Sequence, residues 1–194
     1  MGTLRELLGG GTLRLLTHFL VHPEERLHFR ALQEHTGMGT GALQRELARF
    51  ATLGIIRRVE EAGKVHYEPV HDHPSWGAFR TLIRQHADPV EVVRAALRGV
   101  PGIRVAFVFG STARGCARPG SDVDLFIVEE GMPSAAIGRA TIEAETLLGR
   151  PLDVKRYTPT ALAAKLQRGS DFLRDVAASP KAWVVGSEGA LALV

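Results

Sequence analysis

The stretch VAFVFGSTARGCARPGSDVDLFIV, residues 105–128, decides the fold of this chain. Its first apolar run, Val105–Phe109, predicts a buried strand that ends at Gly110-Ser111. A polar loop rich in glycine, proline and arginine follows, and a second apolar run then carries Asp122 and Asp124. Because side chains alternate between the two faces of a strand, we expect both carboxylates on one face. The apolar residues between and after them are expected to be buried on the other face: Val123, Leu125 and Ile127.

Two carboxylates held this close together favour a bound cation. Without one, their repulsion and partial desolvation raise the pKa of one aspartate and destabilise the fold. A hard divalent ion with oxygen ligands, Mg²⁺ or Mn²⁺, removes the conflict. A third carboxylate is expected nearby, and Asp153 in the apolar run Pro151–Val154 is the candidate, on a strand beside the first two.

The Gly110-Ser111 turn has the properties of a phosphate-binding site. Glycine lets backbone N–H groups approach phosphate oxygens, Ser111 offers a hydroxyl, and a short helix beginning there points its positive end at an anion. Arg114 lies three residues on, where it returns to the same side of the turn and suits a triphosphate. Arg118 either helps hold the triphosphate or lies in a solvated loop. Lys155, Arg156 and Lys165 could line the same site, with surface charge as the default interpretation.

The order of these motifs resembles that of a known superfamily. Glycine-serine, ten intervening residues, aspartate-apolar-aspartate and a later strand aspartate resemble the DNA polymerase beta-like nucleotidyltransferases, specifically their minimal branch. The resemblance covers about residues 99–194. It implies that Asp122 and Asp124 bind magnesium, that Ser111 contacts the nucleotide phosphates, and that Asp153 helps to bind the catalytic metal and to activate the attacking hydroxyl. The implied reaction is in-line transfer of a nucleoside monophosphate from an NTP, with ATP the expected donor, and with two metal ions at the entering and leaving oxygens.

Composition limits the alternatives. The chain has 194 residues, of which 45% are hydrophobic and 23% charged, as expected for a globular protein with two small cores. A single cysteine, Cys116, excludes an internal disulfide and fits a reducing compartment. No apolar segment is long enough for a signal peptide or a membrane span, so we expect a cytoplasmic protein without membrane contact. The net charge is only +3, so any nucleic-acid surface must be local.

The N-terminal part predicts a second kind of domain. Apolar periodicity indicates helices over Thr12–Val21, His28–Thr36 and Thr40–Leu53, followed by strands over Ile55–Glu60 and Lys64–Val70. This is the order of a winged helix-turn-helix, which we expect over residues 1–74. The expected fold class is therefore α+β, with a winged helix-turn-helix followed by a small α/β nucleotidyltransferase domain with a mixed sheet.

The segments FRAL (29–32), TGMGTGALQREL (36–47) and LGII (53–56) resemble winged-helix transcription regulators of the arsenic-repressor-like type. The resemblance implies double-stranded DNA as a partner, with the third helix in the major groove and the hairpin on the flanking backbone. Glu60 and Glu61 depart from this pattern because they would repel DNA. The alternative is that this domain only mediates protein contacts or dimerisation. The residues implied in DNA contacts are Thr40, Gln44, Arg45, Arg49, Arg57, Arg58 and Lys64.

A metal-sensing site in this part is disfavoured. His71-Asp72-His73 offers ligands two residues apart, but it lacks a cysteine pair and a fourth ligand at a recognisable spacing. Two helices expected within residues 75–98 connect the domains, and they either form a homodimer interface or serve only the core.

Three functions remain open. The first is a DNA-binding protein whose Mg²⁺-dependent domain transfers a nucleoside monophosphate to a hydroxyl of a protein, RNA or small molecule. The second is a transcription regulator that binds nucleotide without catalysis. The third is a component of a toxin–antitoxin system.

Overall fold

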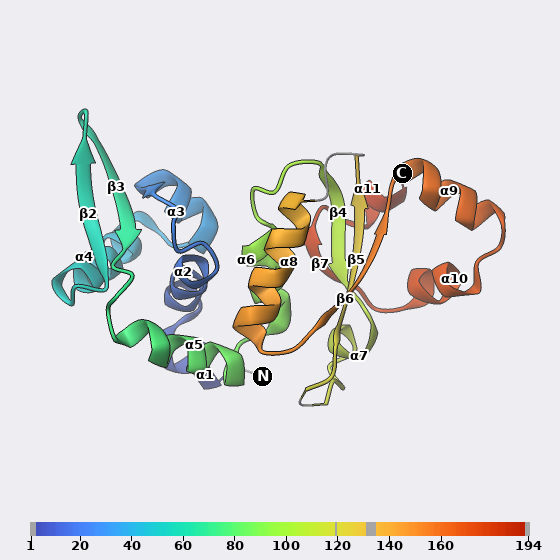
Figure 1. Cartoon of the computed structure of the whole chain (residues 1–194), viewed down its shortest axis with the longest axis horizontal. Coiled ribbons are helices and arrows are strands. Elements are labelled where there is room, and N and C mark those ends of the chain that lie inside the picture. The colour runs from blue at the N-terminus through green and yellow to red at the C-terminus, as the bar shows by residue number, and fades with distance from the viewer. Residues whose placement is uncertain (1–2, 119, 131–134, 193–194) are drawn as a thin grey trace. The chain divides into compact units, whose positions relative to one another are not determined.

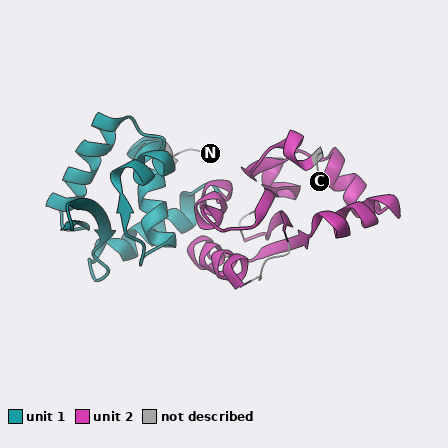
Figure 2. Cartoon of the chain, turned by 90° about the horizontal axis from the view of Figure 1, so that it is seen from above, with its two compact units in different colours: residues 1–88 teal, residues 89–194 magenta. Residues whose placement is uncertain are grey.

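The computed structural model describes residues 3–118, 120–130 and 135–192, and the chain divides into two compact units, residues 1–88 and 89–194 (Figure 2). The helix over residues 75–86 is part of the first unit, and the helix over residues 89–97 is part of the second. Across the described segments, every helix is too short or too polar to cross a membrane.

The first unit consists of helices around a small antiparallel sheet with strand order β1-β3-β2 (Figure 1). Gly37 ends α3 in the left-handed conformation (φ 65°), which is typical of glycine after the last turn of a helix. The expected helices and the hairpin are all present, with ends shifted by one or two residues, while α1 and β1 were not predicted. The elements are α1 (Thr3–Leu8), α2 (Gly10–Val21), β1 (Leu27–His28), α3 (Phe29–Thr36), α4 (Thr40–Thr52), β2 (Ile56–Glu61), β3 (Lys64–Pro69) and α5 (Ser75–His86).

Helix α2 is the centre of this unit, because most of its residues are buried, including Leu15, Leu16 and Phe19. It contacts α1, α3 and α5. Apolar residues of α3 and α4, such as Leu32 and Leu43, are fully buried in the same unit. Burial of these apolar stripes is the main stabilising contribution of each amphipathic helix.

The second unit contains a mixed four-stranded sheet with order β6-β5-β4-β7. Strands β5 and β6 are parallel, while β4 is antiparallel to both β5 and β7. A mixed sheet in this part of the chain was expected from the sequence. The elements are α6 (Pro89–Leu97), β4 (Ile103–Val108), α7 (Gly110–Ala113), β5 (Val123–Glu129), α8 (Ala135–Leu148), β6 (Leu152–Tyr157), α9 (Pro159–Gln167), α10 (Asp171–Ala178), β7 (Ala182–Val185) and α11 (Glu188–Ala192).

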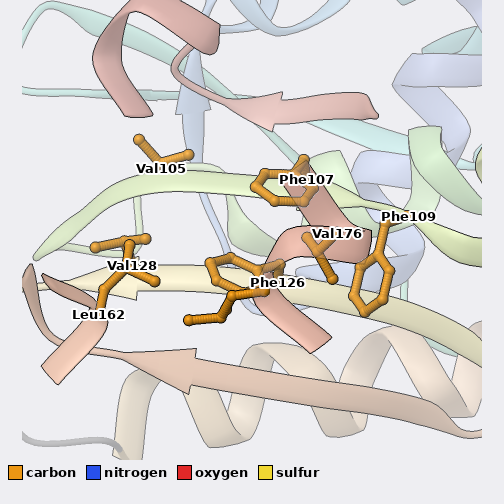
Figure 3. Packing of buried hydrophobic residues seen from close by; sticks show 8 residues of the cluster. Val105, Phe107, Phe109, Phe126, Val128, Leu162 and Val176 are labelled. Atoms are coloured by element: carbon orange, nitrogen blue, oxygen red, sulfur yellow. The ribbon is translucent and has the colours of Figure 1, made fainter. Parts of the chain in front are cut away.

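One face of this sheet is covered by an aromatic core. Phe107 and Phe126 stack with 4.9 Å between ring centroids, and Tyr157 stacks on Phe126 at 5.2 Å. Side chains from α9 and α10 complete the cluster (Figure 3). Its buried members are Val105, Phe107, Phe109, Phe126, Val128, Leu162, Leu173 and Val176.

Strand β5 is buried on both faces along most of its length. Val123, Leu125 and Ile127 are buried as predicted, but Phe126 and Val128 are buried as well. The reason is that α9 and α10 pack on the face that carries Phe126 and Val128, where Leu162, Leu173 and Val176 join the same core cluster. Asp122 was expected on this strand and instead precedes its first residue, in an exposed position.

Candidate active site

The motif residues of the second unit meet at one end of its sheet. Strand β4 ends there, and β5 and β6 both begin there, because β4 runs antiparallel to β5 and β5 runs parallel to β6. Two backbone hydrogen bonds hold this end together: Phe109 N–H donates to Asp124 O at 3.0 Å, and Val123 N–H donates to Pro151 O at 3.0 Å. The turn after β4 therefore lies directly beside the aspartates.

Gly110 packs against the Asp124 carboxylate. Its φ of 66° lies in the left-handed region, and a Cβ placed on it would lie 2.0 Å from Asp124 Oδ2. Heavy atoms cannot come this close, so any side chain at position 110 would force Asp124 to move. Gly110 is thus required by both its backbone conformation and its neighbour.

Asp124 and Asp153 are register partners on the adjacent parallel strands β5 and β6. Neighbouring strands are about 4.8 Å apart, and paired residues project from the same face of the sheet. By alternation this is the face of Phe126 and Tyr157, which stack on each other two and four residues further along their strands. The two carboxylates therefore stand side by side at the end of the aromatic core.

The electrostatics of Asp124 reflect this crowding. Burial raises the pKa of Asp124, and the neighbouring charges of Asp153 and Asp122 raise this pKa further. The positive charges of Arg114 and Lys155 act in the opposite direction and lower the pKa of Asp124. The net shift is upward, because burial and the two neighbouring carboxylates outweigh the positive charges of Arg114 and Lys155.

Lys155 supplies part of that positive charge. Its Nζ donates to Asp153 Oδ1 at 2.8 Å, and this hydrogen bond raises the pKa of Lys155. Lys155 lies two residues after Asp153, so both side chains project from the same face of β6. The ammonium group therefore neutralises Asp153 where the sequence led us to expect a metal ion.

The three aspartates are not as tightly clustered as a formed metal site. A set with ligand atoms all within 4.8 Å of one another occurs elsewhere in the described residues, and it does not include Asp122, Asp124 or Asp153. The donor set nevertheless fits Mg²⁺ or Mn²⁺, since all three donors are carboxylates, and burial together with the charges of Asp153 and Asp122 raises the pKa of Asp124. Convergence of the three on one ion requires side-chain rotation, including release of Asp153 by Lys155.

The loop between the turn and the aspartates carries the predicted nucleotide-binding residues. Cys116 N–H donates to Ser111 O at 3.0 Å, which closes the turn after α7. Arg114 caps α7 and lies close enough to influence the pKa of Asp124. Arg118 is exposed, and its carbonyl accepts hydrogen bonds from Ser121 N–H and Oγ–H. Its guanidinium forms no ion pair with the residues the structure describes.

Comparison with known proteins finds a match for most of the second unit. Residues 91–178 match the family model described as a nucleotidyltransferase domain. The matched segment contains the glycine-serine turn and all three aspartates. The sequence of this segment is therefore similar to that of a nucleotidyltransferase domain.

A solved structure titled "Crystal structure of the toxin-antitoxin with AMP-PNP" is also similar to the chain. It shares 19% sequence identity, the alignment covers 50% of this chain and 73% of that one, and the TM-score is 0.35. No curated protein matches the chain. None of these comparisons identifies a winged helix-turn-helix or an arsenic-repressor-like region.

Of the three further basic residues considered from the sequence, Lys155 alone lies at the carboxylates. Arg156 Nη2 instead contacts Glu129 Oε1 and Oε2 at 2.6 and 2.7 Å. Lys165 Nζ lies 5.1 Å from the centroid of the Tyr157 ring. The two-residue spacing of Asp153 and Lys155 on a strand was the signal that could have singled out Lys155.

The residues predicted to contact DNA lie on α4 and the β2–β3 hairpin, and several of them are engaged within the protein. Thr40 Oγ1 accepts from Gln33 Nε2 at 3.0 Å. Arg49 Nη2 lies 2.7 Å from Glu46 Oε2, while Arg57 pairs with Glu68 at 3.1 Å and Arg58 with Glu60 at 3.5 Å. Within the described part of the chain, Gln44, Arg45 and Lys64 have no side-chain partner.

Replacing Gly110 by alanine should abolish the response of the protein to Mg²⁺. The new Cβ displaces the Asp124 carboxylate, and the left-handed backbone costs about 1–2 kcal/mol of unfolding free energy. Gly115→Ala is the matched control, because Gly115 has a similar φ of 71° but open space around its Cβ position. Thermal unfolding with and without Mg²⁺ checks this. If Gly110→Ala keeps the Mg²⁺-dependent stabilisation of the unchanged protein, Gly110 does not position Asp124.

Asp124→Asn should stabilise the protein at neutral pH when no divalent cation is present. The folded state raises the pKa of Asp124, so ionisation of this group costs stability once the pH exceeds the unfolded-state value. The gain from the substitution should shrink as pH falls through the raised pKa and vanish below the ordinary aspartate range. Denaturant unfolding across pH measures it, with the exposed Asp175→Asn as control. A stability gain that persists at acid pH would contradict the assignment.

Proposed function

We propose that the second unit transfers a nucleoside monophosphate from an NTP, with ATP the favoured donor, to a hydroxyl group of a protein, RNA or small molecule. One observation carries this proposal: Asp124 and Asp153 stand in register on adjacent strands, with Gly110 packed against Asp124. The match of the surrounding segment to a nucleotidyltransferase domain supports it.

In the proposed reaction the acceptor oxygen attacks the α-phosphorus of the NTP. The bond from this phosphorus to the oxygen that bridges to the β-phosphate breaks, and pyrophosphate leaves with the electron pair. Once the hydrogen bond from Lys155 to Asp153 has broken, Asp153 accepts the proton of the acceptor hydroxyl. Gly110, Ser111, Arg114 and Arg118 bind the triphosphate, with the two guanidinium groups balancing its negative charge.

Asp122, Asp124 and Asp153 would hold the divalent cation. Mg²⁺ or Mn²⁺, when bound, would supply charge stabilisation at the entering and leaving oxygens. A bound cation would offset the repulsion from Asp153 and Asp122, which adds to burial in raising the pKa of Asp124.

Binding of nucleotide without turnover is the second candidate, and the Lys155–Asp153 pair favours it. While Lys155 Nζ stays 2.8 Å from Asp153 Oδ1, that oxygen is not available to the proton of an acceptor hydroxyl. In this case the domain would sense nucleotide, and the protein would act as a regulator.

A labelling experiment separates the two candidates. The purified chain is incubated with Mg²⁺ and each of the four NTPs, labelled at the α-phosphate or at the γ-phosphate, in the presence of lysate protein, RNA or small molecules. Transfer of the α-label alone is expected, and Asp122→Asn/Asp124→Asn should reduce it at least about 100-fold. Asp171→Asn/Asp175→Asn on α10 is the matched control and should keep full transfer. Transfer that survives the first double variant would contradict the proposed enzyme, and nucleotide binding without transfer would support the sensor.

For the first unit we propose a winged helix-turn-helix that binds double-stranded DNA. The order α3, α4, β2, β3, together with the three-stranded antiparallel sheet, supports this. The exposed Gln44 and Arg45 on α4 would reach base edges, and Lys64 at the hairpin turn would reach a phosphate.

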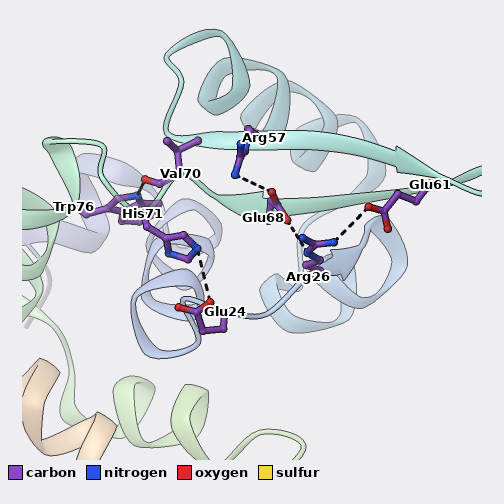
Figure 4. A network of polar contacts seen from close by, with 8 residues as sticks. All are labelled: Glu24, Arg26, Arg57, Glu61, Glu68, Val70, His71 and Trp76. Carbon is purple, nitrogen blue, oxygen red and sulfur yellow. Dashed lines mark hydrogen bonds and ion pairs between the residues drawn. The ribbon is translucent and has the colours of Figure 1, made fainter.

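The hairpin itself is close to neutral, so it should contribute little to DNA affinity. Glu68 contacts both Arg57 and Arg26, and Arg26 also reaches Glu61 (Figure 4). Arg58 is balanced by Glu60. The base-contacting helix α4 must therefore supply most of the affinity and the specificity.

Arg45→Ala should weaken binding to a preferred DNA sequence by about 1–3 kcal/mol if Arg45 contacts a base. Arg80→Ala, on an exposed position of α5, is the control and should bind normally. Fluorescence anisotropy with a sequence selected from a random duplex library measures both at several salt concentrations. Equal affinity of the Arg45 and Arg80 variants would remove α4 from the interface, and failure to select any sequence would favour a protein-contact domain.

A further inference from the structure

A cluster of His18, His22 and Glu25 lies in the first unit, far along the chain from the aspartates. One ligand atom from each of these side chains lies within 4.8 Å of the other two. Neither the proposed nucleotidyl transfer nor the proposed DNA contact uses these residues. We propose that His18, His22 and Glu25 bind one Zn²⁺ ion.

The spacing of the donor atoms fits zinc. Donors 2.0–2.2 Å from a tetrahedral Zn²⁺ are roughly 3.3 Å apart. His18 Nε2 and Glu25 Oε2 already lie 3.1 Å apart, and the centroids of the His18 and His22 rings are separated by 5.0 Å. Small side-chain rotations of His22 therefore complete a three-ligand site.

The backbone holds the three residues in place. His18 and His22 are four apart at the end of α2, so they project from the same side of the helix. His22 N–H donates to His18 O at 2.8 Å, and Glu25 N–H donates to His22 O at 3.2 Å. The first bond continues the helical pattern to His22, and the second closes a turn that keeps Glu25 close to the end of α2.

The surroundings also favour a cation. The carboxyl end of a helix carries partial negative charge, and the cluster lies at the carboxyl end of the twelve-residue helix α2. The His18 side chain is only 3% exposed, so one ligand is held in a packed environment. A third imidazole, His35 of α3, packs on His18 with 4.7 Å between ring centroids, and either His35 or water would take the fourth position.

The donor chemistry separates this site from the carboxylate site of the second unit. Two imidazole nitrogens and one carboxylate oxygen suit Zn²⁺, whereas three carboxylates suit Mg²⁺ or Mn²⁺. The two sites should therefore select different metals. The histidine pair that the sequence analysis weighed, around Asp72, is a different one: His71 is exposed and lies 3.9 Å from Glu24 (Figure 4).

The test measures Zn²⁺ binding to the metal-stripped full chain in excess Mg²⁺. All proteins carry Asp122→Asn/Asp124→Asn, so that the carboxylate site contributes nothing, and failure of the nucleotidyltransferase proposal would not affect the result. His22→Gln and Glu25→Gln remove one ligand each at positions outside the core. The matched controls are His86→Gln and Glu24→Gln, which change exposed residues of the same types. Equilibrium dialysis gives stoichiometry and affinity, and visible absorption of the Co²⁺-loaded protein reports tetrahedral coordination.

We expect one Zn²⁺ per chain and a rise in the unfolding temperature on binding. The two ligand variants should bind at least about tenfold more weakly, since loss of even an indirect partner of a metal ligand costs about 10- to 100-fold. The two controls should bind as the parent does. Unchanged affinity in His22→Gln and Glu25→Gln, or absence of Zn²⁺ binding in the parent, would overturn the proposal and leave a His18–Glu25 ion pair only.

Discussion

The close approach of Gly110 to Asp124 is the constraint on which the candidate active site depends. The turn follows β4, and Asp124 lies on β5. The hydrogen bond from Phe109 N–H to Asp124 O holds the turn and this residue beside each other. The space for a Cβ at position 110 is taken by Asp124 Oδ2. Because the Gly110 backbone lies so close to the Asp124 carboxylate, a phosphate that shares a cation with Asp124 would also lie near the N–H groups of this turn. This contact therefore links the proposed metal ligands to the proposed phosphate-binding turn.

The charges around this contact are mostly negative. Asp122, Asp124 and Asp153 repel one another, and the pKa of Asp124 is raised by burial and by the other two. Lys155 offsets part of the repulsion by pairing with Asp153. Lys155 thus also binds Asp153 Oδ1, an oxygen of the carboxylate that the proposed reaction uses. If a divalent cation displaced the Lys155 ammonium from Asp153, metal binding would also free the Asp153 carboxylate from its ion pair.

Much of the fold could be predicted from the sequence, because the deciding signals were local. The 3.6-residue apolar periodicity defined α2, α3 and α4, Gly37 marked a helix end, and the apolar runs marked β4, β5 and β6. The two-residue strand β1 had too short a pattern to predict. Burial of both faces of β5 could not be predicted from alternation, because it depends on the packing of α9 and α10 against the sheet. From the sequence, Asp153 was expected near Asp124, but their exact register was not predicted. The hydrogen bond from Lys155 to Asp153 and the cluster of His18, His22 and Glu25 could not be predicted, because they depend on side-chain packing.

The most direct test of this account is a crystal structure of the protein with Mg²⁺ and a non-hydrolysable NTP analogue. The account predicts a metal ion bound by Asp122, Asp124 and Asp153, the triphosphate against Gly110 and Ser111, and the Lys155 ammonium moved away from Asp153. A structure in which the nucleotide binds elsewhere, or in which Lys155 stays on Asp153 while no ion joins the three carboxylates, would contradict it.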